Sequence, residues 1–223
     1  MVMTTRLSQG LFITFEGGEG AGKSTQIRRL HARLEALSIK TLVTREPGGT
    51  PGAELIRALI LDGKRPPLDA LTETLLFYAA RANHLSELIR PALTKGDVVL
   101  CDRFSDSTRV YQGVLGAVPS AQVEALETLV VQDTKPDVTI ILDIPPETGL
   151  ARASARRGSH HADRFESETL EFHNRLRQGF LDLAKRETDR IFVVSALGDE
   201  EQIENQIWQT LTSRFSFSER RSA

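Results

Sequence analysis

The residues best suited to chemistry form the run GGEGAGKS, from Gly17 to Ser24. The run fits the pattern G-x-x-x-x-G-K-[ST] at every fixed position, between a predicted strand and a predicted helix. Glycines allow backbone N–H groups to close around a phosphate, Lys23 adds a positive charge, and the Ser24 hydroxyl suits Mg²⁺. The run therefore predicts a loop that binds nucleotide phosphates, although it does not say which reaction follows.

One residue of this loop has no evident use in an anion site. Glu19 places a carboxylate at the centre of the loop, where a negative charge repels phosphate. Either Glu19 points into solvent, or it serves something other than the phosphates of the bound nucleotide. Glu16 ends the preceding predicted strand, and we expect it to support the loop from beneath.

A second polar pair follows another predicted strand, in the run CDRFSDST from Cys101 to Thr108. Asp102 and Arg103 would lie at the carboxyl end of that strand, beside the phosphate loop in a doubly wound sheet. The carboxylate can hold Mg²⁺ or its water, and the guanidinium can bridge donor and acceptor phosphates. The alternative is a structural ion pair between the two residues.

Two helical segments offer groups for a second ligand. Arg57 follows the turn TREPGGT and could reach an anionic acceptor, although a lone arginine more often lies on a solvated helix face. In the run LLFYAARANHL, Phe77 and Arg81 are four residues apart and share one helix face. There a ring can stack on a base while a guanidinium donates to a base carbonyl. Core packing is the alternative for Phe77.

The run STRVYQGVLG adds Thr108 and Gln112 at the same spacing of four residues. A glutamine amide both donates and accepts hydrogen bonds, which suits the edge of a pyrimidine.

Two other motifs suggest different functions, and both are weaker. The runs TKPD (134–137) and SAL (195–197) resemble guanine-reading elements of GTPases. However, TKPD precedes a predicted strand, which is the wrong edge of a parallel sheet for ligand contact. His160, His161 and Asp163 suggest a metal site, but adjacent residues in a flexible loop rarely converge on one ion.

Apolar runs of strand length alternate with helical patterns along the chain. The expected strands are 10–16, 40–46, 97–103, 137–144 and 190–196, and the expected longer helices are 26–37, 71–93, 119–131, 146–157, 167–187 and 199–214. This alternation predicts a three-layer α/β fold with a five-stranded parallel sheet and helices on both faces. We expect one domain over residues 1–223, with a short lid at about 152–166 that includes the basic run RRGSHHADR.

Composition narrows the class of protein. The 223 residues carry a net charge of −2, which gives no global attraction to nucleic acid or membrane. No apolar stretch approaches the roughly 20 residues of a transmembrane helix, and the N-terminal apolar run is too short for a signal peptide. The single cysteine, Cys101, fits a reducing compartment. We therefore expect a cytoplasmic protein whose partners include neither a nucleic-acid polymer nor a membrane.

Taken together, the segments FEGGEGAGKST, TREPGGT, LLFYAARANHL, CDRFSDSTRVYQG and RRGSHHADRFE resemble the thymidylate kinase (dTMP kinase) family in order and spacing. The resemblance extends from Leu11 to about Leu211. It implies transfer of the ATP γ-phosphoryl group to dTMP, giving dTDP and ADP for dTTP synthesis, with Mg²⁺ accompanying ATP. It also implies a homodimer. An apolar face of residues 119–131 or of the 71–93 helix could form its interface, and the alternative is that both faces belong to the core.

The resemblance assigns roles to individual residues. The ATP-binding residues would be Gly17, Gly18, Glu19, Gly20, Ala21, Gly22, Lys23, Ser24, Thr25 and Arg152. The dTMP-binding residues would be Glu19, Pro47, Arg57, Phe77, Arg81, Arg103, Thr108, Tyr111 and Gln112. Ser24 and Asp102 would hold Mg²⁺. In this assignment Glu19 accepts a hydrogen bond from the 3′-OH of dTMP, Tyr111 lies against the deoxyribose, and Arg152 lies against adenine.

Members of the family differ in which segment supplies a catalytic arginine. Here the phosphate loop contains none, whereas the lid carries Arg152, Arg156, Arg157 and Arg164. The chain therefore resembles the bacterial-type arrangement, in which the lid supplies this charge. The expected catalytic residues are Lys23, Arg103, Arg156 and Arg164. A related kinase for another small acceptor, and a nucleotide-binding switch without catalysis, are the alternatives.

Overall fold

The computed structural model describes residues 5–6, 10–62, 66–157 and 165–217. Its main sheet contains five parallel strands in the order β3-β4-β2-β5-β6. These strands are β2 (Leu11–Glu16), β3 (Thr41–Arg45), β4 (Val98–Asp102), β5 (Val138–Asp143) and β6 (Ile191–Ser195). The predicted five-stranded parallel sheet is confirmed. Two short strands, β1 (Thr5–Arg6) and β7 (Phe215–Ser216), pair in parallel as a separate ribbon.

Helices connect the strands. They are α1 (Lys23–Ala36), α2 (Pro51–Leu61), α3 (Ala70–His84), α4 (Arg90–Thr94), α5 (Ser105–Thr108), α6 (Ser120–Val130), α7 (Pro146–Arg157), α8 (Leu170–Arg186) and α9 (Glu200–Thr212). The predicted helix 71–93 is continuous as α3, a π-helical turn η1 (Leu85–Ile89) and α4. A second π-helical segment, η2 (Arg109–Leu115), continues α5 and was not among the helices predicted above.

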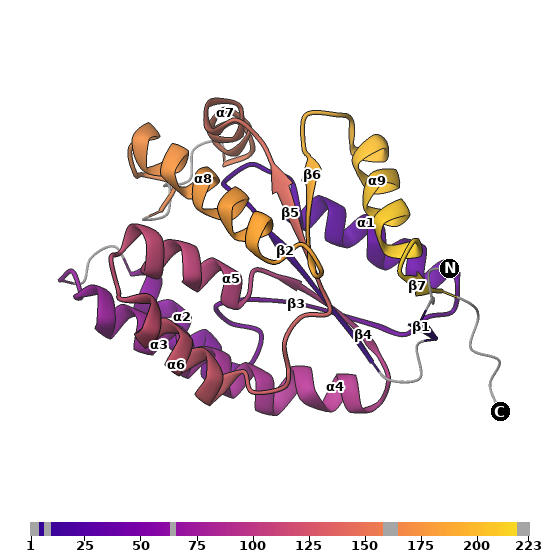
Figure 1. The fold of residues 1–223 in the computed structure, drawn as a ribbon, viewed down its shortest axis with the longest axis horizontal. Coiled ribbons are helices and arrows are strands. Elements are labelled where there is room, and N and C mark those ends of the chain that lie inside the picture. The colour runs from indigo at the N-terminus through magenta and orange to yellow at the C-terminus, as the bar shows by residue number, and fades with distance from the viewer. Residues whose placement is uncertain (1–4, 7–9, 63–65, 158–164, 218–223) are drawn as a thin grey trace.

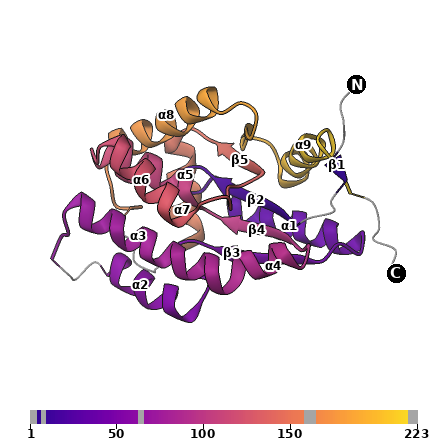
Figure 2. The same cartoon turned by 60° about the horizontal axis from the view of Figure 1, so that its bottom comes forward.

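Side chains of β2 alternate between the two faces of the sheet, as expected for a strand covered by helices on both sides. Leu11 and Ile13 pack into a core that includes buried residues of α1 and α9. Phe12 packs instead with Val99 and Leu85 on the other face. Figures 1 and 2 show these three layers, with α1 and α9 on one side of the sheet and α3 and α4 on the other.

Local sequence explains where several helices begin. The Thr50 side chain accepts a hydrogen bond from the backbone N–H of Ala53 at 3.3 Å, and Pro51 follows as the first helical residue of α2. Asp199 and Gln202 form a capping box at the start of α9. Such caps satisfy backbone donors that have no partner within the helix.

Two sequence interpretations can be compared directly with the fold. Asp137 of the TKPD run accepts a hydrogen bond from the Phe12 backbone at 2.8 Å, at the amino end of β2 and away from its carboxyl end. The GTPase interpretation fails for this reason. On α6, Val123 is buried but Leu129 is 69 % exposed, so the apolar face of residues 119–131 is only partly covered within the chain. Among the described residues, no helix has the length and apolar character to cross a membrane.

Candidate active site

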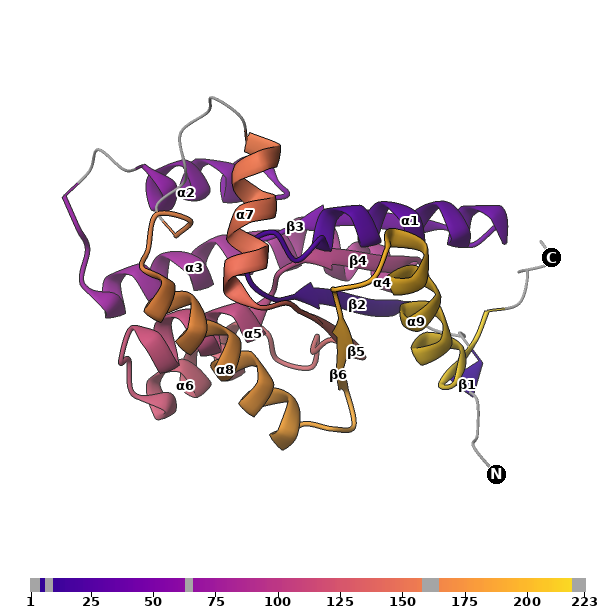
Figure 3. The same cartoon turned by 90° about the horizontal axis from the view of Figure 1, so that it is seen from above.

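A cavity of about 220 Å³ lies at the carboxyl ends of β2, β3 and β4. Figure 3 shows α2, α3, α7 and α8 gathered at the end of the sheet toward which β2 points. The cavity is lined by all nine residues predicted to bind the acceptor: Glu19, Pro47, Arg57, Phe77, Arg81, Arg103, Thr108, Tyr111 and Gln112. Residues of the phosphate loop form the opposite wall: Gly20, Ala21, Gly22, Lys23 and Ser24.

The phosphate loop connects β2 to α1, so its backbone amides precede a helix N-terminus, where anions bind readily. Gly20 has a φ of 66°, and a Cβ atom there would collide with the carbonyl of Gly149. Lys23 Nζ donates to the backbone oxygens of Gly17 and Gly18 at 3.1 and 3.0 Å. Burial lowers the pKa of Lys23, and the nearby Arg103 lowers it further.

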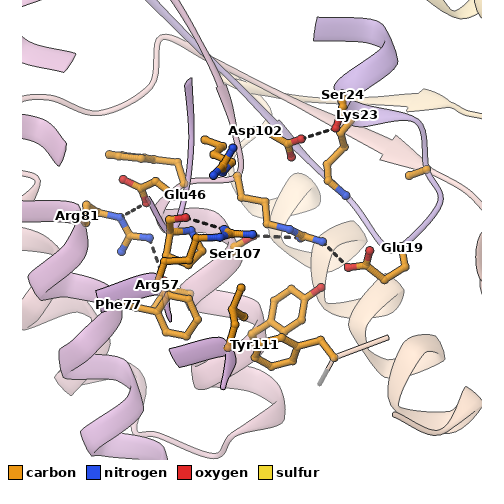
Figure 4. A pocket seen from close by; sticks show the side chains of 18 of the residues that line it. Glu19, Lys23, Ser24, Glu46, Arg57, Phe77, Arg81, Asp102, Ser107 and Tyr111 are labelled. Carbon is orange, nitrogen blue, oxygen red and sulfur yellow. Dashed lines mark hydrogen bonds and ion pairs between the residues drawn. The ribbon is translucent and has the colours of Figure 1, made fainter. Parts of the chain in front are cut away.

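Two oxygen groups meet where the loop joins α1. Ser24 Oγ donates to Asp102 Oδ2 at 2.9 Å, from the first turn of α1 to the end of β4 (Figure 4). Hydroxyl and carboxylate oxygens are the donors that Mg²⁺ prefers, and Mg²⁺ commonly takes only one or two protein ligands beside substrate phosphates. The predicted metal residues therefore fit this ion.

Arg103 adopts an unusual backbone conformation at the centre of the site. Its φ is 67°, in the left-handed region that non-glycine residues seldom adopt, and such positions concentrate at functional sites. Its Nη2 donates to Glu19 Oε1 at 2.7 Å, and its Nη1 donates to the Gly17 oxygen at 3.2 Å. Burial raises the pKa of Glu19, but Arg103 and Lys23 outweigh this effect and hold that pKa below its ordinary value. Glu19 is therefore ionised.

Glu16 holds the turn that contains Arg103. Its carboxylate accepts hydrogen bonds from the Phe104 backbone at 2.8 Å, the Ser107 backbone at 3.2 Å and the Ser107 hydroxyl at 2.6 Å. Glu16 is fully buried, and burial raises its pKa to about 7 although Arg103 lowers it. Glu16 was expected to support the phosphate loop from beneath. Its hydrogen bonds instead support the turn after β4.

Arg81 is a buried residue of the acceptor side. It is 2 % exposed, and its Nε donates to Glu46 Oε2 at 2.8 Å while Nη2 donates to Thr108 Oγ1 at 3.1 Å. The third nitrogen, Nη1, is buried and has no hydrogen-bond partner in the part of the chain that the structure describes. A buried donor without a partner is costly, which points to a ligand acceptor at this position. Figure 4 shows Phe77 on the same side of the cavity.

Tyr111 and Gln112, from η2, form another wall. The Tyr111 ring lies edge-on to Phe165, with ring centroids 5.2 Å apart, and the Arg103 guanidinium lies 5.3 Å from the Tyr111 centroid. Gln112 Nε2 donates to Glu73 Oε1 at 3.0 Å, which fixes the orientation of the amide. These contacts hold the Tyr111 ring and the Gln112 amide in the orientations seen in the structure.

The remaining predicted residues have the following positions. Arg57 Nη1 donates to the Pro47 oxygen at 2.6 Å, and the peptide bond before Pro47 is cis. Arg156 lines the cavity, whereas Arg152 Nη1 donates to the Ala196 oxygen at 2.9 Å outside it.

The other predicted ATP-binding residues lie beside the main cavity. Gly17 and Gly18 line a smaller neighbouring cavity, and Thr25 lies in the first turn of α1. Four residues fall outside the described part of the chain: His160, His161, Asp163 and Arg164.

Several lining residues were not predicted as site residues. Phe165 lies in the expected lid and Ser107 in the run CDRFSDST, but neither had a predicted role in the site. Glu46 belongs to the run TREPGGT and was not a predicted site residue either. Glu73 lies four residues before Phe77 on α3, and that spacing is the signal that could have placed it near the acceptor.

The fold and the site define a class of protein, the P-loop nucleotide kinases: a phosphate loop faces a cavity with cationic and aromatic groups. A family model described as thymidylate kinase matches residues 15–207. The chain belongs to the thymidylate kinase family.

Known proteins support this membership. A thymidylate kinase of Rhodopseudomonas palustris is 54 % identical over 210 residues, covering 94 % of this chain and 91 % of the relative. One of Caulobacter vibrioides is 56 % identical over 190 residues, covering 85 % and 90 %. A crystal structure of a thymidylate kinase from Ehrlichia chaffeensis matches with a TM-score of 0.74 and 33 % identity, over 91 % of this chain and 99 % of that one.

Proposed function

We propose that this enzyme transfers the γ-phosphoryl group of ATP to dTMP, giving dTDP and ADP for dTTP synthesis. The observation that carries the proposal is the single cavity in which the phosphate loop faces all nine expected acceptor residues. The family membership supports dTMP as the acceptor.

The donor side would use the phosphate loop. Backbone amides of Gly17, Gly18, Glu19, Gly20, Ala21 and Gly22 would surround the β-phosphate, with Thr25 at the start of α1. Lys23 would leave its two carbonyl partners in the loop for the phosphate oxygens, since a phosphate offers a stronger charged partner. Arg152 lies beside the loop after β6 and would contact adenine.

The metal would bind between the two sides. Ser24 and Asp102 supply the oxygen groups that would hold Mg²⁺, whose chemistry is to neutralise charge on the phosphates. Ser24 and Asp102 would keep the ion beside the loop, since their oxygens lie 2.9 Å apart.

The acceptor side would bind dTMP at three positions. Phe77 would stack on the base, and Arg81 would donate through Nη1 to a base carbonyl. The polar edge of the base would also meet Thr108 and Gln112, while Tyr111 would lie against the deoxyribose. Within the cavity, the dTMP phosphate would be held by Arg57 and Arg103, beside the turn at Pro47.

Catalysis would then depend on positioning and charge. Phosphoryl transfer needs little covalent help from protein, so Lys23, Arg103, Arg156 and Arg164 would neutralise the charge that develops in the transition state. A lid of about residues 152–166 would close over the phosphates and exclude water, which protects ATP from hydrolysis.

The enzyme would act as a homodimer. Large apolar side chains are exposed on three helices: Leu55 of α2, Leu71 and Leu75 of α3, and Leu129 of α6. Helix α3 contacts both α2 and α6, and the three helices lie next to one another in Figures 1 and 2, so the exposed leucines belong to neighbouring helices. A buried interface would explain this exposure. Light scattering should give a dimeric mass for the wild type and a monomeric mass for Leu55→Glu combined with Leu75→Glu.

An acceptor panel tests the proposed reaction. Formation of ADP would be measured with dTMP, dUMP, dCMP, AMP and GMP at fixed ATP and Mg²⁺. We expect kcat/KM for dTMP to exceed every other value by about tenfold or more, which corresponds to about 1.4 kcal/mol of selective binding. Equal use of another acceptor would assign a related kinase activity, and no turnover with any acceptor would favour a nucleotide-binding switch.

A further inference from the structure

Buried polar side chains connect β3 to the base-binding side of the cavity. Thr44 Oγ1 lies 2.7 Å from His84 Nε2, and His84 Nδ1 lies 3.1 Å from Glu46 Oε1. The other oxygen of Glu46 accepts from Arg81 Nε at 2.8 Å. We name Thr44, His84, Glu46 and Arg81 the arginine relay.

The relay has an inner and an outer part. Glu46 and Arg81 line the cavity, whereas Thr44 and His84 lie behind them and are not among its lining residues. Exposure is 8 % for Thr44 and zero for His84. Neither outer residue can therefore touch a ligand, and any effect on binding must pass through Glu46 and Arg81.

Hydrogen-bond chemistry fixes the direction of the relay. Carboxylate oxygens accept hydrogen bonds, so we assign the proton between His84 and Glu46 to His84 Nδ1. With this tautomer, Nε2 accepts from the Thr44 hydroxyl. Each Glu46 oxygen has its own donor, one from His84 and one from Arg81, and this arrangement prevents rotation of the carboxylate.

A fixed carboxylate in turn fixes the guanidinium. Arg81 is held at Nε by Glu46 and at Nη2 by Thr108, and two attachment points define the plane of a rigid planar group. Burial opposes its charge, but Glu46 outweighs burial and raises the pKa of Arg81 above its ordinary value. The buried Nη1 donor therefore points in one direction, set by residues that lie behind it.

The turn after β3 covers the relay closely. A Cβ atom at Gly49 would lie 2.5 Å from both His84 Nε2 and Thr44 Oγ1, and Gly49 has a φ of 88°. No larger residue fits here without displacing the relay. The glycine thus brings backbone against the His84–Thr44 contact and keeps water from it.

We propose that His84, supported by Thr44, is a positioning residue for base recognition, which holds Glu46 so that Arg81 presents Nη1 to a base carbonyl. The inference rests on the proposed function, because it requires the base of dTMP to lie against Arg81. It adds two residues that touch no ligand to the determinants of acceptor specificity.

Steady-state kinetics of three variants test the proposal. His84→Leu removes both ring contacts, His84→Asn retains a donor for Glu46, and His31→Leu on α1 is a matched control away from the cavity. We expect His84→Leu to raise the KM for dTMP about tenfold, the loss of roughly one charged hydrogen bond, with the KM for ATP within about twofold. His84→Asn should show a smaller rise, and His31→Leu none.

Base selectivity separates positioning from a loss of stability. In the proposed complex, the 4-carbonyl of dTMP lies against Arg81 Nη1. dCMP carries an amino group at that position, so the ratio of kcat/KM for dTMP over dCMP reports on the Arg81 contact. We expect this ratio to fall about tenfold in His84→Leu and by a smaller factor in Thr44→Val. Thermal unfolding would verify that each variant is folded. If His84→Leu does not fold, Thr44→Val provides the test.

The outcomes distinguish the two proposals. A wild type without preference for dTMP over dCMP would overturn the proposed function itself. A wild type with that preference, together with folded His84 and Thr44 variants that keep it and keep the KM for dTMP, would overturn only the role of the relay.

Discussion

The Arg103 guanidinium donates to the Glu19 carboxylate at 2.7 Å and so joins the turn after β4 to the phosphate loop. The pair explains how an anion-binding loop tolerates a carboxylate. Glu19 lines the large cavity and is held there by a cation. The Glu19 carboxylate would repel the donor phosphates, but it faces the cavity and is therefore available to the second ligand.

Removal of Arg103 should mainly affect the chemical step. Arg103→Ala is expected to lower kcat about 10³-fold with little change in the KM for ATP, because its charge acts chiefly in the transition state. Arg103→Lys should recover only part of the loss, since an ammonium cannot reproduce the forked geometry. Arg28→Ala, on the exposed side of α1, is the control. A kcat near the wild-type value for Arg103→Ala would contradict the role.

Loss of the Glu19 carboxylate should affect the two substrates unequally. Glu19→Ala is expected to raise the KM for dTMP by roughly tenfold or more, the cost of one charged hydrogen bond, with a much smaller effect on ATP. Substrate titrations would measure both values, with Glu35→Ala at the far end of α1 as the control. Equal weakening of both substrates would show that Glu19 does not belong to the acceptor side.

Neutralising Asp102 should change the metal requirement. In Asp102→Asn, the Mg²⁺ concentration for half-maximal activity at fixed ATP should rise about tenfold or more, because one anionic oxygen is lost beside Ser24. Asp182→Asn, on α8 with a side chain that is 46 % exposed, is the matched control. An unchanged Mg²⁺ titration with reduced kcat would instead indicate that Asp102 acts through the adjacent Arg103.

The buried Glu16 should make stability depend on pH. Its pKa is about 7 in the folded protein, against an ordinary value of 4.5, so the folded state binds more protons between these values. The free energy of unfolding contributed by this group therefore decreases as pH rises through that window, by about 3 kcal/mol.

Glu16→Gln keeps the shape of the side chain and cannot ionise. Chemical denaturation at pH 4 to 8 should show the variant gaining stability relative to the wild type as pH rises, with the gain levelling off above about pH 8. A constant difference between the two proteins across this range would mean that the Glu16 carboxyl does not titrate there.

Local patterns were enough to predict the framework. The apolar runs gave each of the five strands to within one residue at either end, because a buried parallel strand is a continuous apolar segment. The phosphate loop was equally clear, since glycines and a lysine at fixed spacing leave few alternatives. Motif order then placed Phe77 and Thr108 in the cavity.

What the sequence could not predict are the pairings between distant segments. Glu16 meets Ser107 across 91 positions, and Arg81 meets Glu46 across 35. Neither spacing carries a periodic signal, because such contacts arise only when strands and helices pack together. The sequence also could not predict what covers an apolar helix face. Leu129 fits the apolar pattern of its helix but is exposed in the monomer, because that pattern does not reveal whether the monomer or another molecule covers the face.

The central claim is that the cavity beside the phosphate loop binds dTMP, and a crystal structure with dTMP tests it most directly. We predict the base stacked on Phe77 with a carbonyl within hydrogen-bond distance of Arg81 Nη1, and the phosphate between Arg57 and Arg103. dTMP bound elsewhere, or with its base toward Lys23 and its phosphate toward Arg81, would contradict the account.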